Sequence, residues 1–278
     1  MFVTILIFIA ILGVLVFVHE AGHFLIAKKS GMKVDEFGFG FPPRLVGIQK
    51  LDGKFKFLWG HKDPIDKEKT VYSINWIPLG GFVKIVGENN ESESDPNSFI
   101  NKPFFPRLLT LLGGVLMNVV LAWILFSAGY MYGLPVAYDD TQDLGKHAQV
   151  RDAQLAIIEV SPDSPANKAG LLAGDIVTGI NGEKFATVPE LKDYIFKNKG
   201  QAFEFSIKRI TQEQKLVVQS HSEPPAGQGP TGIALATIGK LKFPVVQAIW
   251  EGGRTTISQL GAIFTGMYQL FSKGVGLD

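Results

Sequence analysis

Apolar residues run almost without interruption from Phe2 to Ala27 at the start of the chain. A helix of about 20 mostly apolar residues is long enough to cross the hydrocarbon core of a bilayer. Residues 108–134 form a second such run, with Arg107 immediately before it. Residues 243–271 combine apolar side chains at roughly helical spacing with charged ones, which predicts an amphipathic helix lying on the membrane or leading into it. The pattern therefore predicts an α-helical membrane domain, residues 1–134, with at least two transmembrane helices.

The segment between the two apolar runs, residues 28–107, has a different pattern. Residues 71–87 alternate β-forming residues around Pro78-Leu79-Gly80-Gly81, which predicts a β-hairpin that turns at these four residues. The hairpin is unusually apolar for a loop outside the membrane. It either forms a small core of its own or dips into the membrane beside the first helix, where neighbouring protein groups can satisfy its backbone.

Residues 150–238 have the pattern of a soluble α+β domain. Alternating or short apolar stretches predict strands at residues 154–160, 203–209, 215–220 and 231–236. A helix is predicted after Thr187, because threonine is a suitable N-cap residue.

Composition and charge agree with a membrane protein that carries a soluble part. The 278 residues are 46% hydrophobic and 19% charged, and the formal net charge is +1. The charge balance gives no indication of a nucleic-acid partner. The apolar composition makes the membrane the expected partner. Cysteine is absent, which excludes disulfides and cysteine-ligated metal sites.

The distribution of basic residues predicts the topology. A signal peptide would carry positive charge before its apolar core, but the first basic residue here is Lys28, after the run. Lys28, Lys29 and Lys33 follow the first span, so the positive-inside rule places residues 28–107 in the cytoplasm. The second span then returns the chain outward, and the soluble domain is extracytoplasmic.

The first apolar run contains His19, Glu20 and His23, which form an H-E-x-x-H motif. On a helix, residues four apart share one face, so both imidazoles can reach one metal ion. Two histidines suit zinc, and the intervening glutamate can deprotonate a water that the metal activates. The alternative is that two histidines and a glutamate are buried in lipid without a function, but ionisable residues inside a membrane are usually functional.

The soluble domain resembles a PDZ domain. The resemblance lies in Ser164-Pro165-Ala166, Ala169-Gly170-Leu171, Gly174-Asp175-Ile176-Val177 and Ile180-Asn181-Gly182. The order of the strands is similar to the permuted bacterial type, in which the loop that holds a peptide carboxylate comes late. That loop would be at Gly232, Ile233 and Ala234. The domain either binds a peptide terminus there or acts as a steric gate over the membrane domain.

Taken in order, the motifs of the whole chain resemble the bacterial, PDZ-bearing group of the site-2 protease family of intramembrane zinc metalloproteases. The resemblance implies that zinc is bound by His19 and His23 and that Glu20 is the general base. It also implies substrate-binding roles for Gly80, Gly81 and Asn118, with Gly114 in the same second-span element. An asparagine in a span can instead hold helices together.

The same resemblance implies the biological setting. Such enzymes lie in the bacterial cytoplasmic membrane and act in regulated intramembrane proteolysis. Their substrates are single-pass membrane proteins already trimmed by a site-1 protease, such as anti-sigma factors, and some clear remnant signal peptides.

The sequence departs from this family in one respect. The family takes its third zinc ligand from an aspartate within N-x-x-P-x-x-x-L-D-G, and that motif is absent. Asn75 to Pro78 matches only its first half, and Leu51-Asp52-Gly53 only its second, where Asp52 is more simply a turn residue. We therefore expect the chain to be an N-terminal fragment that binds zinc weakly and has little activity.

Two other functions fit parts of the sequence. A membrane-tethered zincin would place H-E-x-x-H in a water-exposed domain, whereas here the motif lies inside the first apolar run. A non-catalytic PDZ scaffold or assembly factor would explain the missing aspartate but not the intact His-Glu-His set.

Overall fold

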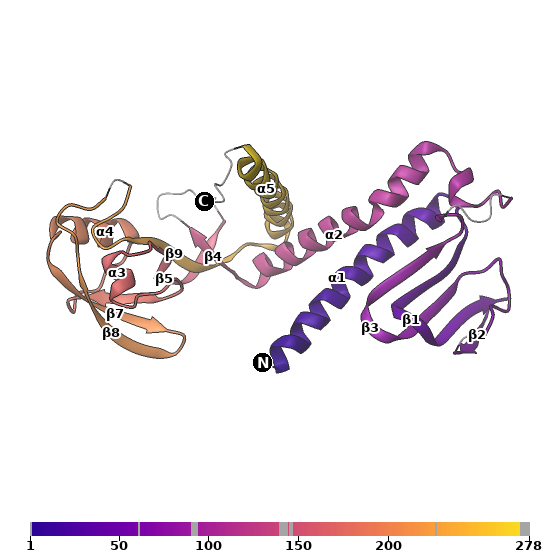
Figure 1. Ribbon diagram of the computed structural model, residues 1–278, viewed down its shortest axis with the longest axis horizontal. Helices are drawn as coiled ribbons and strands as arrows, with labels where there is room; N and C mark the ends of the chain where they lie inside the picture. Colours follow the sequence, from indigo (N-terminus) through magenta and orange to yellow (C-terminus); the bar gives the residue numbers. More distant parts are fainter. Residues whose placement is uncertain are drawn as a thin grey trace. The chain divides into compact units, whose positions relative to one another are not determined.

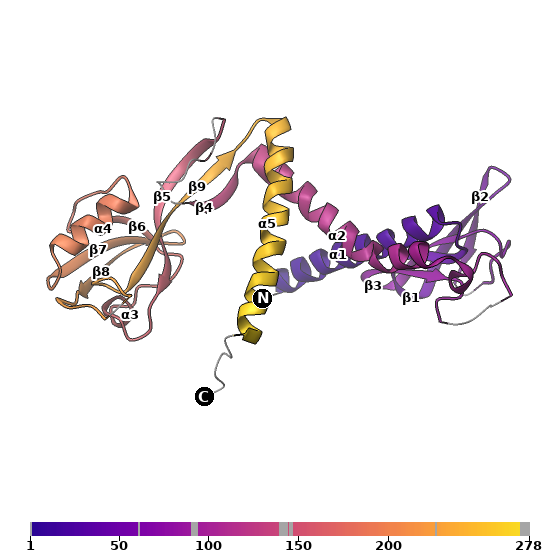
Figure 2. The same ribbon diagram turned by 90° about the horizontal axis from the view of Figure 1, so that it is seen from above.

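The computed structural model describes residues 2–60, 62–89, 94–138, 144, 147–225 and 227–272. The chain divides into two compact units, residues 1–124 and 125–278, and the boundary falls within the long helix α2 (Phe104–Tyr132). Most elements of both units are labelled in Figure 1, and β6 is labelled in Figure 2.

Among the described residues, two helices are long and apolar enough, by length and composition, to cross a membrane. The first is α1 (Phe2–Lys29), whose 28 residues extend for roughly 42 Å at the usual helical rise. It ends with Lys28 and Lys29 in its last turn. The second is α2, which begins directly after Pro103. Only Gly13, Gly22 and Ala27 of α1 are buried, so most of its apolar surface faces outward, as expected for a helix in lipid.

Within the first unit, α1 and α2 touch through their backbones. A Cβ atom added to Gly22 would collide with the carbonyl group of Gly113, and one added to Gly113 would lie 2.8 Å from the carbonyl oxygen of Gly22. Small residues permit such close helix crossings in membranes. The crossing fixes which residues of α1 and α2 face one another.

A sheet in the first unit packs against α1 (Figure 1). Its strand order is β2-β1-β3, with bounds β1 (Val34–Leu51), β2 (Lys54–Trp59) and β3 (Val71–Ile85). Asp52 and Gly53 join β1 to β2, with φ values of 48° and 79°. Two consecutive residues with positive φ are typical of a type I′ hairpin turn, so the prediction that Asp52 is a turn residue is confirmed.

The predicted hairpin at residues 71–87 is wrong in its pairing. Its two arms do not pair with each other; Phe37 of β1 is the partner of both Tyr72 and Val83. The first part of β1 therefore lies between the two ends of β3, and both strands turn back on themselves. The backbone groups that a hairpin would pair internally are paired with β1 instead.

A short 3-10 helix, Phe99–Asn101, precedes α2.

Aromatic side chains attach this sheet to α1. The ring of Phe37 stacks on that of Phe24, with centroids 4.6 Å apart, and lies 5.4 Å from that of Phe17. Phe17 also meets Phe39 edge to face at 5.7 Å. Such pairs contribute about 0.5–1.5 kcal/mol each beyond the area that they bury. They hold β1 beside the segment of α1, from Phe17 to Phe24, that contains His19, Glu20 and His23.

The second unit is an α+β domain built on one sheet of strand order β4-β9-β5-β6-β7-β8, in which β4, β9 and β5 lie side by side (Figure 2). The strands are β4 (Leu134–Tyr138), β5 (Gln149–Val160), β6 (Ile176–Ile180), β7 (Ala202–Arg209), β8 (Gln212–Gln219) and β9 (Ile233–Lys242). The strands expected within residues 154–160, 203–209, 215–220 and 231–236 are found in β5, β7, β8 and β9, and agree with the expectation of a PDZ domain. Sequence analysis missed β4 and β6.

Two helices complete this domain, α3 (Pro165–Lys168) and α4 (Val188–Lys197). Thr187 is the N-cap of α4, as predicted, and its side chain accepts a hydrogen bond from the backbone N–H of Glu190. Glu190 in turn accepts one from the N–H of Ala186. This reciprocal capping starts the helix, whose apolar face is buried in a core dominated by Phe203, Phe205 and aliphatic side chains.

The last helix, α5 (Val245–Ser272), lies where residues 243–271 were expected to be helical. Its start packs on the end of α2, where a Cβ on Gly252 would collide with Ser127. Tyr130 adds a hydroxyl hydrogen bond to Thr255 at 2.9 Å. The side chains of Tyr130, Leu241, Phe243 and Ala248 form a second buried cluster around this crossing.

An ion pair between Asp175, directly before β6, and Arg209, at the end of β7, joins these two parts of the PDZ-type domain. The side chain of Asp175 is 1% exposed, and Arg209 donates to both of its carboxylate oxygens at 2.7 Å. Burial alone would raise the pKa of Asp175, but the hydrogen bonds from Arg209 and from the N–H of Leu172, with the charge of Arg209, lower it below its usual value.

We expect Gly22→Ala to destabilise the packing of α1 on α2 by about 1–3 kcal/mol, because the added methyl group meets backbone that cannot move aside. Thermal unfolding in detergent would measure the change. Gly261→Ala is the matched control, because an added Cβ meets nothing within 4 Å on helix α5. Equal stability of the two variants would contradict the crossing.

We expect Asp175→Asn to lower the stability of the domain by about 1.5–3 kcal/mol at neutral pH, through loss of the charged hydrogen bonds. Since the pKa of Asp175 is lower in the folded state, its contribution is present above the ordinary value of 3.8 and is lost as the pH falls through the lowered pKa. The wild type and the variant should therefore converge in acid. Glu204→Gln, in the exposed pair with Lys215, should cost at most about 1 kcal/mol. A pH-independent difference for Asp175→Asn would contradict the assignment.

Candidate metal centre

The H-E-x-x-H residues lie on one turn of α1. The ring centroids of His19 and His23 are 4.9 Å apart, and both side chains are half-buried. The helix therefore brings the two imidazoles together, as the four-residue spacing predicts.

Helix α2 orients the imidazole of His23. Its Nδ1 lies 2.7 Å from the backbone carbonyl oxygen of Thr110. A carbonyl oxygen can only accept, so Nδ1 must carry the proton and donate it. The proton is then fixed on Nδ1, and Nε2 is left as the basic nitrogen that can bind a metal.

The imidazole of His19 faces Asn118, also on α2. The amide nitrogen of Asn118 lies 3.4 Å from Nδ1, while its carbonyl oxygen Oδ1 is buried without a partner. Turning the amide by 180° would place Oδ1 opposite Nδ1, so that a proton on Nδ1 satisfies both groups. His19 would then present Nε2 as a ligand, in the same way as His23.

Gly114 leaves room at the edge of the His19 ring. A Cβ at this position would lie only 2.5 Å from Nε2 and from Cε1 of the imidazole. Any larger residue would therefore push the ring away from its place. The expected second-span element, Gly114 and Asn118, thus faces the first of the two histidines.

Strand β3 approaches the same turn of α1 from another side. A Cβ on Gly80 would lie 2.5 Å from Val16, and one on Gly81 would lie 3.1 Å from the ring of Phe17. Two residues further along, the backbone of Val83 donates a hydrogen bond to the carboxylate of Glu20. The double glycine therefore allows β3 to lie close enough to hold the carboxylate.

The donor set fits two of the ligands of a zinc site. Two neutral imidazoles with Nδ1 engaged are typical zinc ligands, and a carboxylate lies one residue from the first of them. Within the described ranges, His, Cys, Asp and Glu side chains form no group of three that could hold a metal ion. The third ligand is thus not identified in the described part of the chain.

The residues expected in the peptide-binding loop belong to the second unit. Gly232 has φ +73°, and a Cβ there would collide with the side chain of Ser164, the N-cap of α3. Ser161 donates its N–H to the carbonyl of Gly232, whose own N–H is donated to Gly229. The loop before Ile233 and Ala234 is therefore held rigidly, and the N–H of Gly232 is already engaged.

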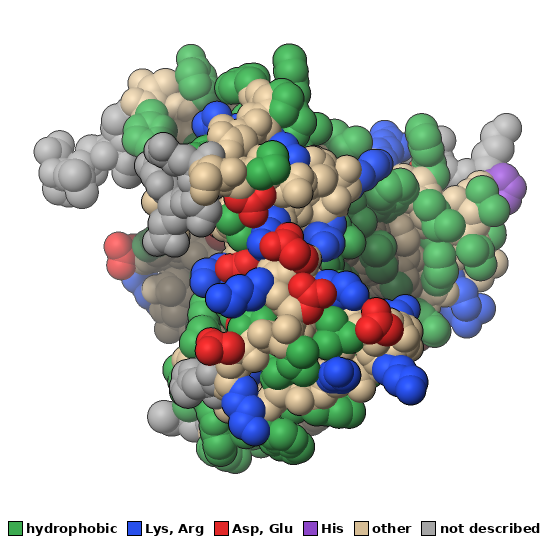
Figure 3. Space-filling view, turned by 90° about the vertical axis from the view of Figure 1, so that its right-hand side faces the viewer, with side chains coloured by type: hydrophobic (Ala, Val, Ile, Leu, Met, Phe, Trp, Pro, Cys, Tyr) green, Lys and Arg blue, Asp and Glu red, His purple; other side chains and the backbone are tan. Residues whose placement is uncertain are grey.

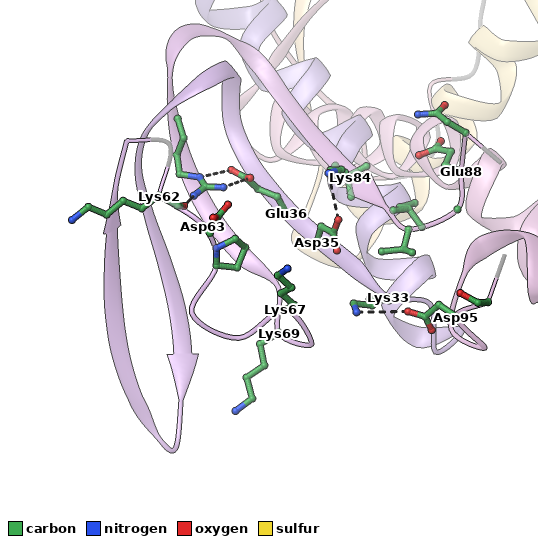
Figure 4. Close-up of a pocket in the computed structure, with 18 residues that line it drawn as sticks. Lys33, Asp35, Glu36, Lys62, Asp63, Lys67, Lys69, Lys84, Glu88 and Asp95 are labelled. Carbon is green, nitrogen blue, oxygen red and sulfur yellow. Dashed lines mark hydrogen bonds and ion pairs between the residues drawn. The ribbon is translucent and has the colours of Figure 1, made fainter. Parts of the chain in front are cut away.

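A polar cavity of the first unit is lined by Val83 but by none of His19, Glu20 and His23. Its volume is about 690 Å³, and basic and acidic side chains are mixed around it (Figure 4). Arg44 pairs with Glu36, Lys33 with Asp95 and Lys84 with Asp35. Figure 3 shows charges of both signs interspersed on this face. Because most of these charges neutralise one another and none belongs to the H-E-x-x-H turn, the cavity is a solvated face of the sheet.

Sequence reasoning missed three contacts at the metal centre. These are the carbonyl of Thr110, the N–H of Val83 and the Gly22–Gly113 crossing. The first two are backbone groups, which any residue type supplies. The glycine pair at 113–114 in the middle of an apolar span was the available signal for the crossing.

The chain is similar in sequence to several known proteins. A protein of Clostridium acetobutylicum named as a candidate zinc metalloprotease is 34% identical over 208 residues, which are 74% of this chain and 51% of that protein. A similarly named protein of Nostoc is 29% identical, with 84% of this chain and 58% of that protein covered. Zinc metalloprotease RasP of Geobacillus kaustophilus is 25% identical, with 96% and 76% covered. The chain therefore spans between half and three fifths of the length of the first two relatives.

Among solved structures, the PDZ domain of an SdrC-like protein from Listeria monocytogenes is 28% identical, with a TM-score of 0.27; it covers 30% of this chain and 86% of that one. The model of Peptidase family M50 matches residues 7–60 and 56–277, almost the whole chain. This match confirms the resemblance to site-2 proteases, and the chain belongs to Peptidase family M50.

Proposed function

We propose that the protein is an intramembrane zinc metalloprotease that cleaves transmembrane segments of other membrane proteins. The observation that carries the proposal is the pair of histidines on α1, both of which have Nδ1 facing an oriented partner on α2. The matched family and the names of the relatives support the same activity.

His19 and His23 would hold the zinc ion through Nε2, and the ion when bound would activate a water for attack on a peptide bond. Glu20 would accept the proton of that water on its carboxylate and pass it to the leaving amine. The N–H of Val83 keeps the carboxylate in place between these transfers. Asn118 and Thr110 would hold the two rings through Nδ1 and leave Nε2 of each as the possible ligand.

Two histidines are fewer than the three protein ligands of a typical catalytic zinc site. The family resemblance assigns the third to an aspartate in a motif that this sequence does not contain. The proposed activity is therefore that of the whole protein, and it is tested on the whole protein.

The proposed substrates are single-pass membrane proteins that a site-1 protease has already trimmed, such as anti-sigma factors, or remnant signal peptides. A transmembrane helix must unwind before its peptide bonds can react, because its backbone groups are bonded to one another. The part of β3 that carries Gly80 and Gly81 offers a strand edge beside Glu20 to which an unwound segment could be added.

The proposed location is the bacterial cytoplasmic membrane, with residues 28–107 in the cytoplasm and the PDZ-type domain outside. Lys28, Lys29, Lys33 and Arg107 support this orientation, because basic residues accumulate on the cytoplasmic side. The PDZ-type domain would bind a peptide terminus at Gly232, Ile233 and Ala234, or screen substrates by size.

We expect Glu20→Gln to reduce cleavage of a membrane substrate by at least about 100-fold, since a positioned general base contributes about 10²- to 10⁴-fold. Zinc content should stay unchanged, because Glu20 need not bind the ion. Turnover and metal content would be measured on the same purified protein. Glu213→Gln, on an exposed strand, is the control. Full activity of Glu20→Gln would remove this residue from the mechanism, whereas the absence of cleavage by the wild type would favour a non-catalytic scaffold.

We expect opposite labelling of single cysteines at Ser94 and Lys199, both of which are exposed. The chain contains no cysteine of its own, so each label reports one position. A membrane-impermeant maleimide added to intact spheroplasts should label Lys199→Cys only. Labelling of Ser94→Cys alone would reverse the proposed topology.

A further inference from the structure

The sheet of the first unit has one covered face and one bare face. On the covered face, Gln49 is fully buried, and its side-chain amide is hydrogen-bonded to backbone groups within residues 65–69. On the bare face, every second residue of β2 is aromatic, and these side chains are 61–65% exposed: Phe55, Phe57 and Trp59. A contiguous apolar patch of this kind marks a surface that contacts an apolar partner.

A groove runs along the bare face beside these aromatic rings. Directly opposed residues of an antiparallel pair lie on the same face, so Ile48 of β1 stands next to Phe57. Val46 likewise stands next to Trp59. The groove has a volume of about 250 Å³ and is lined almost entirely by aromatic and aliphatic side chains of α1, β1 and β3. These include Phe17, Phe37, Phe39, Tyr72 and Ile74. The lining therefore suits an apolar ligand.

The groove lies along a candidate membrane span. Lys28, at the end of α1, donates a hydrogen bond to the hydroxyl of Thr70, directly before β3. The ring of Phe24, one turn earlier on the helix, meets that of Tyr72 edge to face at 5.9 Å. The contacts of the double glycine with α1 continue this course toward the middle of the helix. Because β3 runs along α1, the groove would lie at the depth of the hydrocarbon in a bilayer.

A lysine stands at the end of the groove that is nearest the lysines of α1. The register of β1 with β3 places Ile48 opposite Tyr72, and Lys50 lies two residues further toward that end. Its Nζ is 5.9 Å from the ring centroid of Phe55, the residue directly opposed to it, so Lys50 belongs to the bare face. A lysine at the border of the hydrocarbon can lay its stem on apolar surface and reach an anionic headgroup with its ammonium group.

We propose that the groove binds one phospholipid of the cytoplasmic leaflet that carries an anionic headgroup. An acyl chain lies over Val46 and Ile48, between the aromatic row of β2 and the side chains of β3, and the headgroup meets Lys50. The apolar lining matches the chain, and it continues onto α1 through Phe17. The positive charge at the end of the groove matches the headgroup. No residue of the metal centre takes part, so the lipid site goes beyond the proposed protease activity and either can fail alone.

The test compares two lipids by fluorescence quenching in liposomes that contain the full chain. A bimane label on Phe57→Cys stands at the rim of the groove and is unique, because the wild type has no cysteine. Phosphatidylglycerol and phosphatidylcholine, each with a nitroxide in the middle of one acyl chain, are added in turn to the same bilayer. Their quenching gives the relative association constant of the two lipids. A label on Ile7→Cys, an exposed position of α1, reports ordinary bilayer lipid.

Three variants separate this site from the general charge of the protein. Lys50→Ala removes the charge at the end of the groove. Lys56→Ala, the matched control, removes the same charge from the same hairpin, but Lys56 lies opposite Gln49 and so belongs to the covered face. Val46→Trp fills the groove with a larger side chain and leaves Lys50 in place.

We expect the label at position 57 to favour phosphatidylglycerol by about fivefold, which is the effect of one lysine near an anionic headgroup. Lys50→Ala and Val46→Trp should each remove this preference, whereas Lys56→Ala should keep it within about twofold. The label at position 7 should show no preference. If Val46→Trp does not fold, the two lysine variants still decide.

Three results would overturn the proposal. No quenching of the label at position 57 by either lipid would mean that protein, such as a second copy of the chain, covers the bare face. Equal quenching by the two lipids would mean ordinary bilayer contact without a headgroup site. An equal loss of preference in Lys50→Ala and Lys56→Ala would assign the effect to the general charge of the hairpin.

Discussion

The backbone contact between Gly22 and Gly113 sets the geometry on which the metal centre depends. It brings α1 and α2 closer than any pair of larger residues would allow, and it fixes how far one helix is shifted along the other. One turn to either side of it, Thr110 then faces His23 and Asn118 faces His19. Both hydrogen bonds that orient the imidazoles join α1 to α2 close to this contact. The placement of the two rings therefore follows from two residues that have no side chain.

The sheet of the first unit completes the site by a second close approach. Gly80 and Gly81 let β3 lie directly on Val16 and Phe17, one turn before Glu20. The stacked rings of Phe24 and Phe37 hold the sheet on the same helix. The apolar helix α1 can thus carry the carboxylate of Glu20, because the N–H of Val83 replaces part of the hydration that this carboxylate loses.

Local features of this protein could be predicted from its sequence, and non-local ones could not. The apolar runs, the Asp52-Gly53 turn and the Thr187 cap depend on neighbouring residues, and the structure has all of them. The interlocked pairing of β1 and β3 depends on which distant strand competes for Tyr72 and Val83, and the alternation of side chains does not decide this. At the metal centre, the histidines and Glu20 follow from one motif. The carbonyl of Thr110 leaves no trace in the sequence, because every residue has one.

The polar residues of α2 show how one apolar helix serves both units. Four polar side chains of this helix lie at contacts, whereas Tyr132 at its end is 89% exposed. The hydroxyl of Thr110 donates to the carbonyl of Pro106 and Asn118 faces His19, whereas Ser127 and Tyr130 meet the start of α5. In lipid a polar side chain without a partner is costly, so each position is explained by what it touches. The first half of α2 thus orients the two histidines, while its end packs against β4 and the start of α5.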